Sequence, residues 1–140
     1  LDAEARVVVL SHLGRPKGKP DPASSLAPVA ERLRELLDRD VVFVPYPDGE
    51  RAARLVSEVP RGGLALLENT RFLTGETDND PALAEAWAAL GDLYVNDAFG
   101  TAHRAHASTA GLARAMIAKG GKAVAGLLMA RELRFLEEVL

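Results

Sequence analysis

The chain has 140 residues, of which 48% are hydrophobic, and a formal net charge of -3. That length and apolar content suffice for one domain with one core, and they exclude a disordered chain. The mildly acidic balance excludes a nucleic-acid binder, and the absence of cysteine excludes disulfides and thiolate metal sites. No apolar run approaches the roughly 20 residues that cross a bilayer, and residues 1–6 lack signal-peptide features, so a cytoplasmic location is expected.

Short apolar runs predict four strands. They lie at residues 7–10 (VVVL), 41–44 (VVFV), 64–67 (LALL) and 93–95 (LYV), and segments with helical spacing separate them. Runs this apolar are typical of parallel strands that are covered on both faces. The alternation predicts an α/β fold: a doubly wound, Rossmann-like parallel β-sheet with helices on both faces, in three α/β/α layers.

The first helix is expected over residues 25–38. Ser24 and Ser25 are typical capping residues, and an apolar stripe with the i, i+3, i+4, i+7 spacing of a core-facing helix follows them. The members of this stripe are Leu26, Val29, Ala30, Leu33, Leu36 and Leu37.

Stop and start signals mark the other helices. The second is expected to begin near Asp48 and to end before Pro60, and the third to span residues 80–91 with Trp87 in the core. No element is predicted between residues 107 and 125. A final helix is expected, with a stripe of Met129, Leu133, Leu136 and Leu140. Since this pattern reaches the last residue and a buried strand starts close to the first, both ends are expected to be cut.

Arginines follow the first, third and fourth predicted strands. They are Arg15 in residues 11–16 (SHLGRP), Arg71 in 69–72 (NTRF) and Arg104 in 96–106 (NDAFGTAHRAH). No cation follows the second strand directly, where the sequence reads PYPDG. In open parallel sheets ligands bind beyond the carboxyl ends of the strands, so the three arginines are expected at one binding edge.

Three arginines in an acidic chain point to a small anion. Guanidinium groups suit phosphate and carboxylate, because their planar fork pairs with two oxygens at once. Gly14 and Gly100 are expected where the backbone turns tightly or approaches the ligand and offers its amides. His12 stands beside Arg15 and is expected at the same edge.

Less specific interpretations compete with this site. Arg15 or Arg71 alone would more often be an ordinary surface residue. His103 and His106 have the spacing of a metal pair but no third ligand, so no metal is expected. The acidic run at residues 76–80 is expected to be a solvated helix start. Neither G-x-x-x-x-G-K-[ST] nor G-x-G-x-x-G occurs, so no nucleotide is expected on this chain.

The motifs after the strands resemble those of phosphoglycerate kinases, in the family's order. The resemblance extends to residues 25–30 (SLAPVA) and 125–129 (AGLLM) and so covers nearly the whole chain. It implies that residues 1–140 form most of the N-terminal, substrate-binding domain, including the start of the helix that leads to the nucleotide-binding domain. The implied ligand is 3-phosphoglycerate or 1,3-bisphosphoglycerate.

The resemblance also implies roles for individual residues. Those expected to contact the substrate are His12, Leu13, Gly14, Arg15, Arg71 and Arg104. The residues expected to lie next to these and to position them, without contacting the substrate, are Asn69, Asp97, Gly100 and His103. No catalytic residue is expected within this chain, because the family's first strand, with an aspartate, an asparagine and a nearby arginine, would precede Leu1.

The implied function is that of a glycolytic, monomeric, cytoplasmic phosphotransferase. It moves a phosphoryl group reversibly between 1,3-bisphosphoglycerate and ADP, giving 3-phosphoglycerate and ATP. Mg-ATP or Mg-ADP would bind mainly to the C-terminal domain, so the 140-residue chain alone is expected to be inactive. Two alternatives stay open: a non-catalytic module that binds a small phosphorylated metabolite, and a structural domain without a ligand.

Overall fold

The computed structural model describes residues 1 and 3–139, the side chain of Val139 excepted. These residues form two compact units, Leu1–Glu76 and the part from Thr77 on, and each is described by itself. Each unit contains parallel strands joined by helices, which confirms the predicted α/β class. None of the helices in the described residues is long and apolar enough to span a membrane.

The first unit is built on a three-stranded parallel sheet. Its strands are β1 (Val7–Val9), β2 (Val41–Val44) and β3 (Leu64–Leu67), in the order β1-β3-β2. All four residues of β3 are buried, as the apolar run predicts for a central strand. Because the strands are parallel, the loops after β1 and β3 leave the sheet side by side, whereas β2 lies on the far side of β3.

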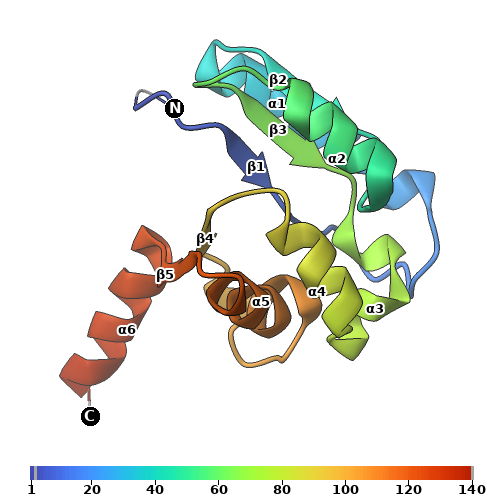
Figure 1. Cartoon of the computed structure of the whole chain (residues 1–140). Helices are drawn as coiled ribbons and strands as arrows, with labels where there is room; N and C mark the ends of the chain where they lie inside the picture. The colour runs from blue at the N-terminus through green and yellow to red at the C-terminus, as the bar shows by residue number, and fades with distance from the viewer. Residues whose placement is uncertain (2, 140) are drawn as a thin grey trace. The chain divides into compact units, whose positions relative to one another are not determined.

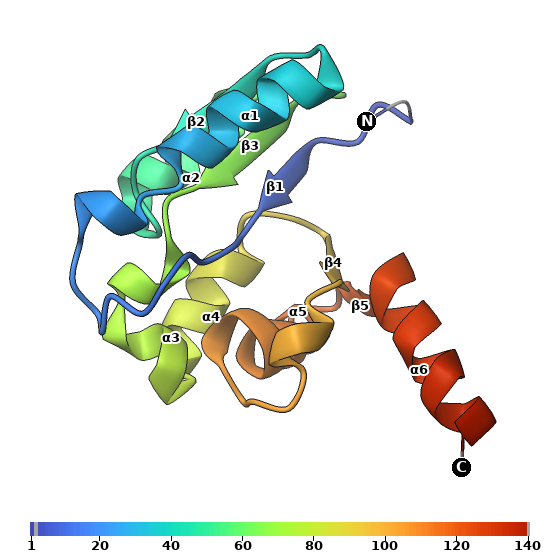
Figure 2. The same cartoon turned by 180° about the vertical axis from the view of Figure 1, so that it is seen from behind.

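Two helices cover opposite faces of this sheet. They are α1 (Ala27–Leu37) and α2 (Gly49–Glu58), and each lies in front of the sheet in one of two views that differ by half a turn (Figures 1 and 2). The core on the α1 side consists of Leu26, Ala30, Val41, Leu64 and Leu66. Helices on both faces were predicted from the apolar strands, and this unit confirms them.

The first helix differs from its prediction in two respects. Ser24 does not cap it, because Ser24 belongs to a 3-10 turn at Pro22–Ser24, and the cap position of α1 is Leu26. Its buried stripe is also narrower than predicted. Leu26 and Ala30 are buried and Leu33 packs against the core, but Val29, Leu36 and Leu37 are exposed.

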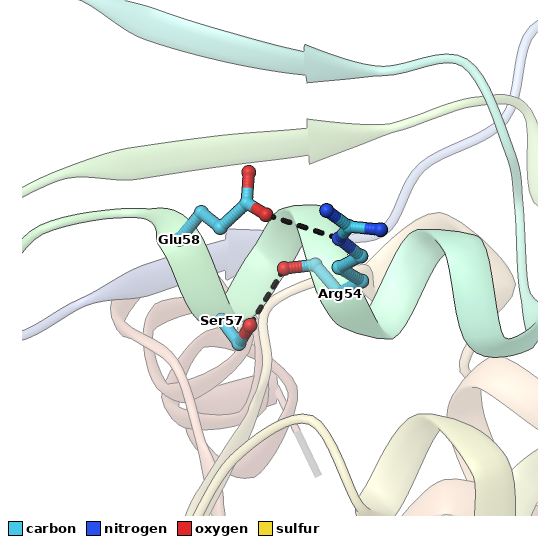
Figure 3. A network of polar contacts seen from close by, with 3 residues as sticks. All are labelled: Arg54, Ser57 and Glu58. Carbon is cyan, nitrogen blue, oxygen red and sulfur yellow. Dashed lines mark hydrogen bonds and ion pairs between the residues drawn. The ribbon is translucent and has the colours of Figure 1, made fainter.

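The second helix matches its prediction. Ala52, Val56 and Val59 are buried, and the helix ends at Glu58, before Pro60. Its outer surface is polar and is held by local contacts: Arg54 Nε lies 3.3 Å from Glu58 Oε1, and Ser57 Oγ donates to the Arg54 carbonyl (Figure 3).

The acidic run at residues 76–80 is not a solvated helix start throughout. Glu76 lies in the short helix α3 (Thr74–Asp78) and is only 1% exposed. Asp80 does behave as predicted, because its carboxylate accepts a hydrogen bond of 3.0 Å from the Leu83 amide at the start of α4 (Pro81–Ala88). Trp87 in α4 is buried, as predicted.

The second unit contains a two-stranded parallel sheet of β4 (Leu93–Asn96) and β5 (Lys122–Ala125). The sequence did not predict β5, nor the π-helical turn at Ala107–Gly111 and the helix α5 (Leu112–Ala118) that follows it. Helix α5 packs against α4 and against both strands.

Two predictions of burial in this unit are wrong. Leu93 and Val95 of β4 are about half exposed, although their run was expected to be covered on both faces. The final helix is present as α6 (Leu127–Val139), but only Met129 of its predicted stripe is buried, and Leu133 and Leu136 are exposed. Leu140 lies outside the described residues. Apolar periodicity identified these elements correctly but not what covers them.

Candidate anion-binding site

The loops that leave β1 and β3 are joined directly. The amide of Thr70 donates a hydrogen bond of 3.0 Å to the carbonyl of Ser11. This contact connects the segment that carries Arg15 to the segment that carries Arg71. Both arginines therefore belong to neighbouring loops at one edge of the sheet, as the strand order predicts.

Gly14 occupies a turn that only glycine adopts readily. Its φ is +66°, and a Cβ at this position would lie 3.1 Å from Ser24 Oγ. The tight turn predicted at Gly14 is confirmed. Gly100 lies in the 3-10 turn Phe99–Thr101, its φ is not in the left-handed region, and a Cβ there would meet nothing within 4 Å. The protein itself therefore does not require glycine at this position, and a close approach to the ligand stays a prediction.

Replacing Gly14 by alanine is expected to lower the free energy of unfolding by about 1–2 kcal/mol, because alanine is strained at this φ. Gly100→Ala, the matched control, is expected to change stability by no more than about 0.5 kcal/mol. Urea denaturation of the full-length protein measures both. Equal stabilities of the two variants would contradict the steric role of Gly14.

Asn69 connects three segments from the end of β3. Its side chain is fully buried, and its Nδ2 donates hydrogen bonds of 2.8 Å to the carbonyls of both Leu13 and Ser24. Its Oδ1 accepts a bond of 3.0 Å from the Arg71 amide and starts the 3-10 turn Thr70–Phe72. The predicted supporting residue thus lies behind the loop that carries Gly14 and Arg15.

The two arginines of this edge are held differently. Arg71 Nη1 donates a bond of 3.1 Å to the Gly14 carbonyl, so that its guanidinium lies against the loop after β1. Arg15 is exposed, and its side chain has no hydrogen bond or ion pair to any part of the chain that the structure describes. An exposed cation without an acidic partner is available to an anion. His12 lies half-buried in the same loop.

The sequence did not predict that Glu68 holds together the end of β3 and the start of α1. Glu68 is 8% exposed, and its carboxylate accepts three bonds of 2.7 Å, from Ser25 Oγ and from the amides of Leu26 and Asn69. It therefore stabilises the positive end of α1, the role that the sequence gave to Ser24 and Ser25. Ser25 shares this role, because its Oγ accepts a bond of 3.2 Å from the Ala27 amide. The available signal was a carboxylate directly after a buried strand.

Arg104 and His103 belong to the second unit. They follow β4 and the 3-10 turn Phe99–Thr101, and Arg104 Nε donates a bond of 3.0 Å to His103 Nε2. Both side chains are exposed, and Arg104 has no acidic partner among the described residues. Arg15 and Arg71 belong to the first unit, so the convergence of Arg104 with them stays a prediction.

The carboxylate of Asp97 is directed to α6. Its Oδ1 accepts a bond of 2.9 Å from the Met129 amide in the first turn of that helix. The Gly126 amide donates a bond of 2.8 Å to the carbonyl of Asn96, the last residue of β4, so Asn96 and Asp97 together hold the start of α6. The structure assigns Asp97 a capping contact, whereas a role behind the anion site stays a prediction.

Among the described residues, no three His, Cys, Asp or Glu side chains are grouped so that they could hold a metal ion. His106 is buried, and its amide donates to Thr109 Oγ1 at the start of the π-helical turn.

Burial raises the pKa of the Asp48 carboxyl, in the loop after β2, above its ordinary 3.8. At pH values between the ordinary pKa and the raised pKa, the folded chain binds more protons at Asp48 than the unfolded chain does. The free energy of unfolding therefore falls as the pH rises through this range. The stability of Asp48→Asn relative to wild type is therefore expected to increase from pH 4 to pH 7, as measured by urea denaturation. A constant difference would contradict the shift.

These features define a class of protein: a parallel α/β protein with arginines in the loops that follow its strands, the edge at which open sheets of this kind bind their ligands. The whole chain, residues 1–140, matches the family model described as "Phosphoglycerate kinase". The chain belongs to the phosphoglycerate kinase family.

Individual relatives agree with this membership. The chain is 50% identical over 138 residues to a phosphoglycerate kinase of Fervidobacterium nodosum, covering 99% of this chain and 33% of that protein. It is 54% identical over 134 residues to one of Thermosipho africanus, covering 96% and 32%. The solved phosphoglycerate kinase of Coxiella burnetii has a TM-score of 0.84 at 41% identity, over 99% of this chain and 33% of that one. The chain thus spans about a third of the length of these relatives.

Proposed function

We propose that this chain supplies the phosphoglycerate-binding part of a phosphoglycerate kinase. The complete enzyme moves a phosphoryl group reversibly between 1,3-bisphosphoglycerate and ADP, giving 3-phosphoglycerate and ATP. The observation that carries the proposal is the joined pair of loops after β1 and β3, which present Arg15, Arg71 and the turn at Gly14 at one edge. Residues 1–140 are then most of the N-terminal domain.

The charges of the ligand and of the arginines match. At neutral pH a phosphate carries about -1.5 to -2, and the carboxylate adds one more negative charge. Arg15, Arg71 and Arg104 together come close to neutralising this ligand. A charge on His12 is not needed. Its proposed role is contact with the substrate from the loop that also presents Leu13, Gly14 and Arg15.

The residues of this chain do not fit the magnesium nucleotide. The sequence has no glycine-rich phosphate loop, and the described residues contain no grouped set of metal ligands. We therefore assign Mg-ATP or Mg-ADP, which supplies or accepts the phosphoryl group, to another part of the complete protein. What this chain contributes is binding and orientation of the phosphoglycerate, the main tasks of proteins in phosphoryl transfer.

Assay of the full-length protein with 3-phosphoglycerate and Mg-ATP tests the proposal. Formation of 1,3-bisphosphoglycerate and ADP is expected, and its absence would refute the kinase function. The purified 140-residue chain is expected to show no turnover, since it contains no nucleotide-binding motif. Measurable activity of the chain alone would contradict this assignment of roles.

A binding module that senses or carries a phosphorylated metabolite is the second candidate. It is favoured by the exposed Arg15 without an acidic partner in the described part of the chain, next to loops that contain no nucleotide motif. Saturable binding of 3-phosphoglycerate without any turnover by the full-length protein would support this module. Turnover would exclude it.

A further inference from the structure

Two successive carbonyl groups of the loop after β1 are held by residues from the end of β3. The Leu13 carbonyl accepts from Asn69 Nδ2 at 2.8 Å, and the Gly14 carbonyl accepts from Arg71 Nη1 at 3.1 Å. The second Nδ2 donor of Asn69 goes to the Ser24 carbonyl, also at 2.8 Å. Asn69 thus connects both ends of the segment between residues 13 and 24 to β3.

These contacts fix the direction of two amide groups. In a trans peptide the N–H points opposite to the C=O of the same unit, and the described chain has no cis peptide bond. The Gly14 N–H therefore points away from Asn69, and the Arg15 N–H points away from Arg71 Nη1. Neither N–H has an acceptor within the described residues. With Gly14 at a φ of +66°, successive amides of this kind form a concavity that binds anions.

We propose that Asn69 is the positioning residue of this amide pair and, through it, of the phosphoglycerate site. The proposal rests on the function proposed above. Asn69 does not touch the ligand itself, because its side chain is 0% exposed. It acts through two contacts. Its Nδ2 holds the Leu13 carbonyl and so orients the Leu13–Gly14 peptide, and its Oδ1 holds the Arg71 amide in the turn that positions the Arg71 side chain.

No other side chain reproduces these contacts. Asn69 uses both of its side-chain N–H donors and its oxygen in hydrogen bonds to Leu13, Ser24 and Arg71. Leucine has the same number and branching of side-chain heavy atoms but no hydrogen-bonding group, so it would leave two carbonyl groups and one amide without their partner. Since unsatisfied groups favour a rearranged loop, the two amides would lose their fixed direction.

The test compares Asn69→Leu with Val44→Ala in the full-length protein. Val44 is fully buried in β2, and its carbonyl is hydrogen-bonded to the Glu68 amide rather than to the loop after β1, so its truncation is expected to lower stability without changing the two amides. Asn69→Leu is expected to raise the KM for 3-phosphoglycerate at least about 10-fold and to leave the KM for Mg-ATP within about 2-fold. Val44→Ala is expected to leave both KM values within about 2-fold. If Asn69→Leu does not fold, Asn69→Ser, which is too short to reach both carbonyls, takes its place.

Calorimetric titration with 3-phosphoglycerate separates the possible failures. Normal wild-type turnover with unchanged KM and Kd in the Asn69 variants would overturn the positioning role alone. Wild-type binding without turnover would overturn the kinase function, and the Kd of the Asn69 variants would then decide their role. A wild-type protein that neither binds nor turns over phosphoglycerate would overturn both proposals.

Discussion

Replacing Arg71 by alanine is expected to raise the KM of the full-length enzyme for 3-phosphoglycerate by about 10- to 100-fold. A hydrogen bond between charged groups contributes about 1.5–3 kcal/mol, and 1.4 kcal/mol corresponds to a factor of ten in affinity. Removal of the guanidinium also releases the Gly14 carbonyl, so that the ligand loses a cation and a fixed loop together. The KM for Mg-ATP is expected to stay within about 2-fold, since the nucleotide is assigned elsewhere.

Arg54→Ala is the matched control for Arg71→Ala. Arg54 lies on α2, and its side chain is 82% exposed and paired with Glu58 (Figure 3). An exposed pair of this kind contributes about 0–1 kcal/mol, and the KM for phosphoglycerate is expected to stay unchanged. If both variants changed this KM equally, the effect would come from net charge rather than from a site at the strand ends.

Gly126→Ala is expected to lower the free energy of unfolding by about 1–3 kcal/mol, the usual cost of overpacking. A Cβ on Gly126 would lie 2.6 Å from the Cβ of Asp97, an atom that cannot move without its backbone. The shift would also remove the contact between Asp97 and the Met129 amide. Thermal and urea denaturation of the full-length protein measure the change.

Gly91→Ala serves as the control for this substitution. A Cβ on Gly91 would meet nothing within 4 Å, and its φ is not in the left-handed region. Its effect on stability is expected to stay within about 0.5 kcal/mol. A Gly126→Ala protein as stable as the Gly91→Ala protein would show that the start of α6 is not tied to Asp97.

Most of the regular structure follows from local pattern. The four predicted strands and the helices between them exist because short apolar runs, capping residues and proline stops act over a few residues. Asp80 caps its helix, and Pro60 follows the end of α2, as predicted. The short strand β5 was missed because only one of its four residues is β-branched. Helix α5 was missed although its residues favour helices, because seven residues are too few to show a clear apolar period.

Burial could not be predicted equally well. Glu76 and Glu68 are enclosed although acidic side chains are normally exposed, because each is placed by the tertiary fold rather than by its neighbours in sequence. Conversely, Val29 and Leu36 are exposed although they continue an apolar stripe. Periodicity shows which residues share a face, but not which segment covers that face.

The site was predictable at the level of loops and less so at the level of contacts. Parallel strands bring their carboxyl ends to one edge, which is why Arg15 and Arg71 could be grouped from the sequence. The geometry of Asn69 could not be foreseen, since it depends on carbonyls 56 and 45 residues away in sequence. The sequence also did not reveal that the carboxylate of Asp97 accepts a hydrogen bond from the first turn of α6.

The central claim is that the loops after β1 and β3 hold the phosphoglycerate. A crystal structure of the full-length protein with 3-phosphoglycerate tests it most directly. The ligand's anionic groups are expected within hydrogen-bond distance of the guanidinium groups of Arg15 and Arg71 and of the amides of Gly14 and Arg15. Phosphoglycerate bound away from the carboxyl ends of β1 and β3, with these groups still in contact only with solvent and protein, would contradict the claim.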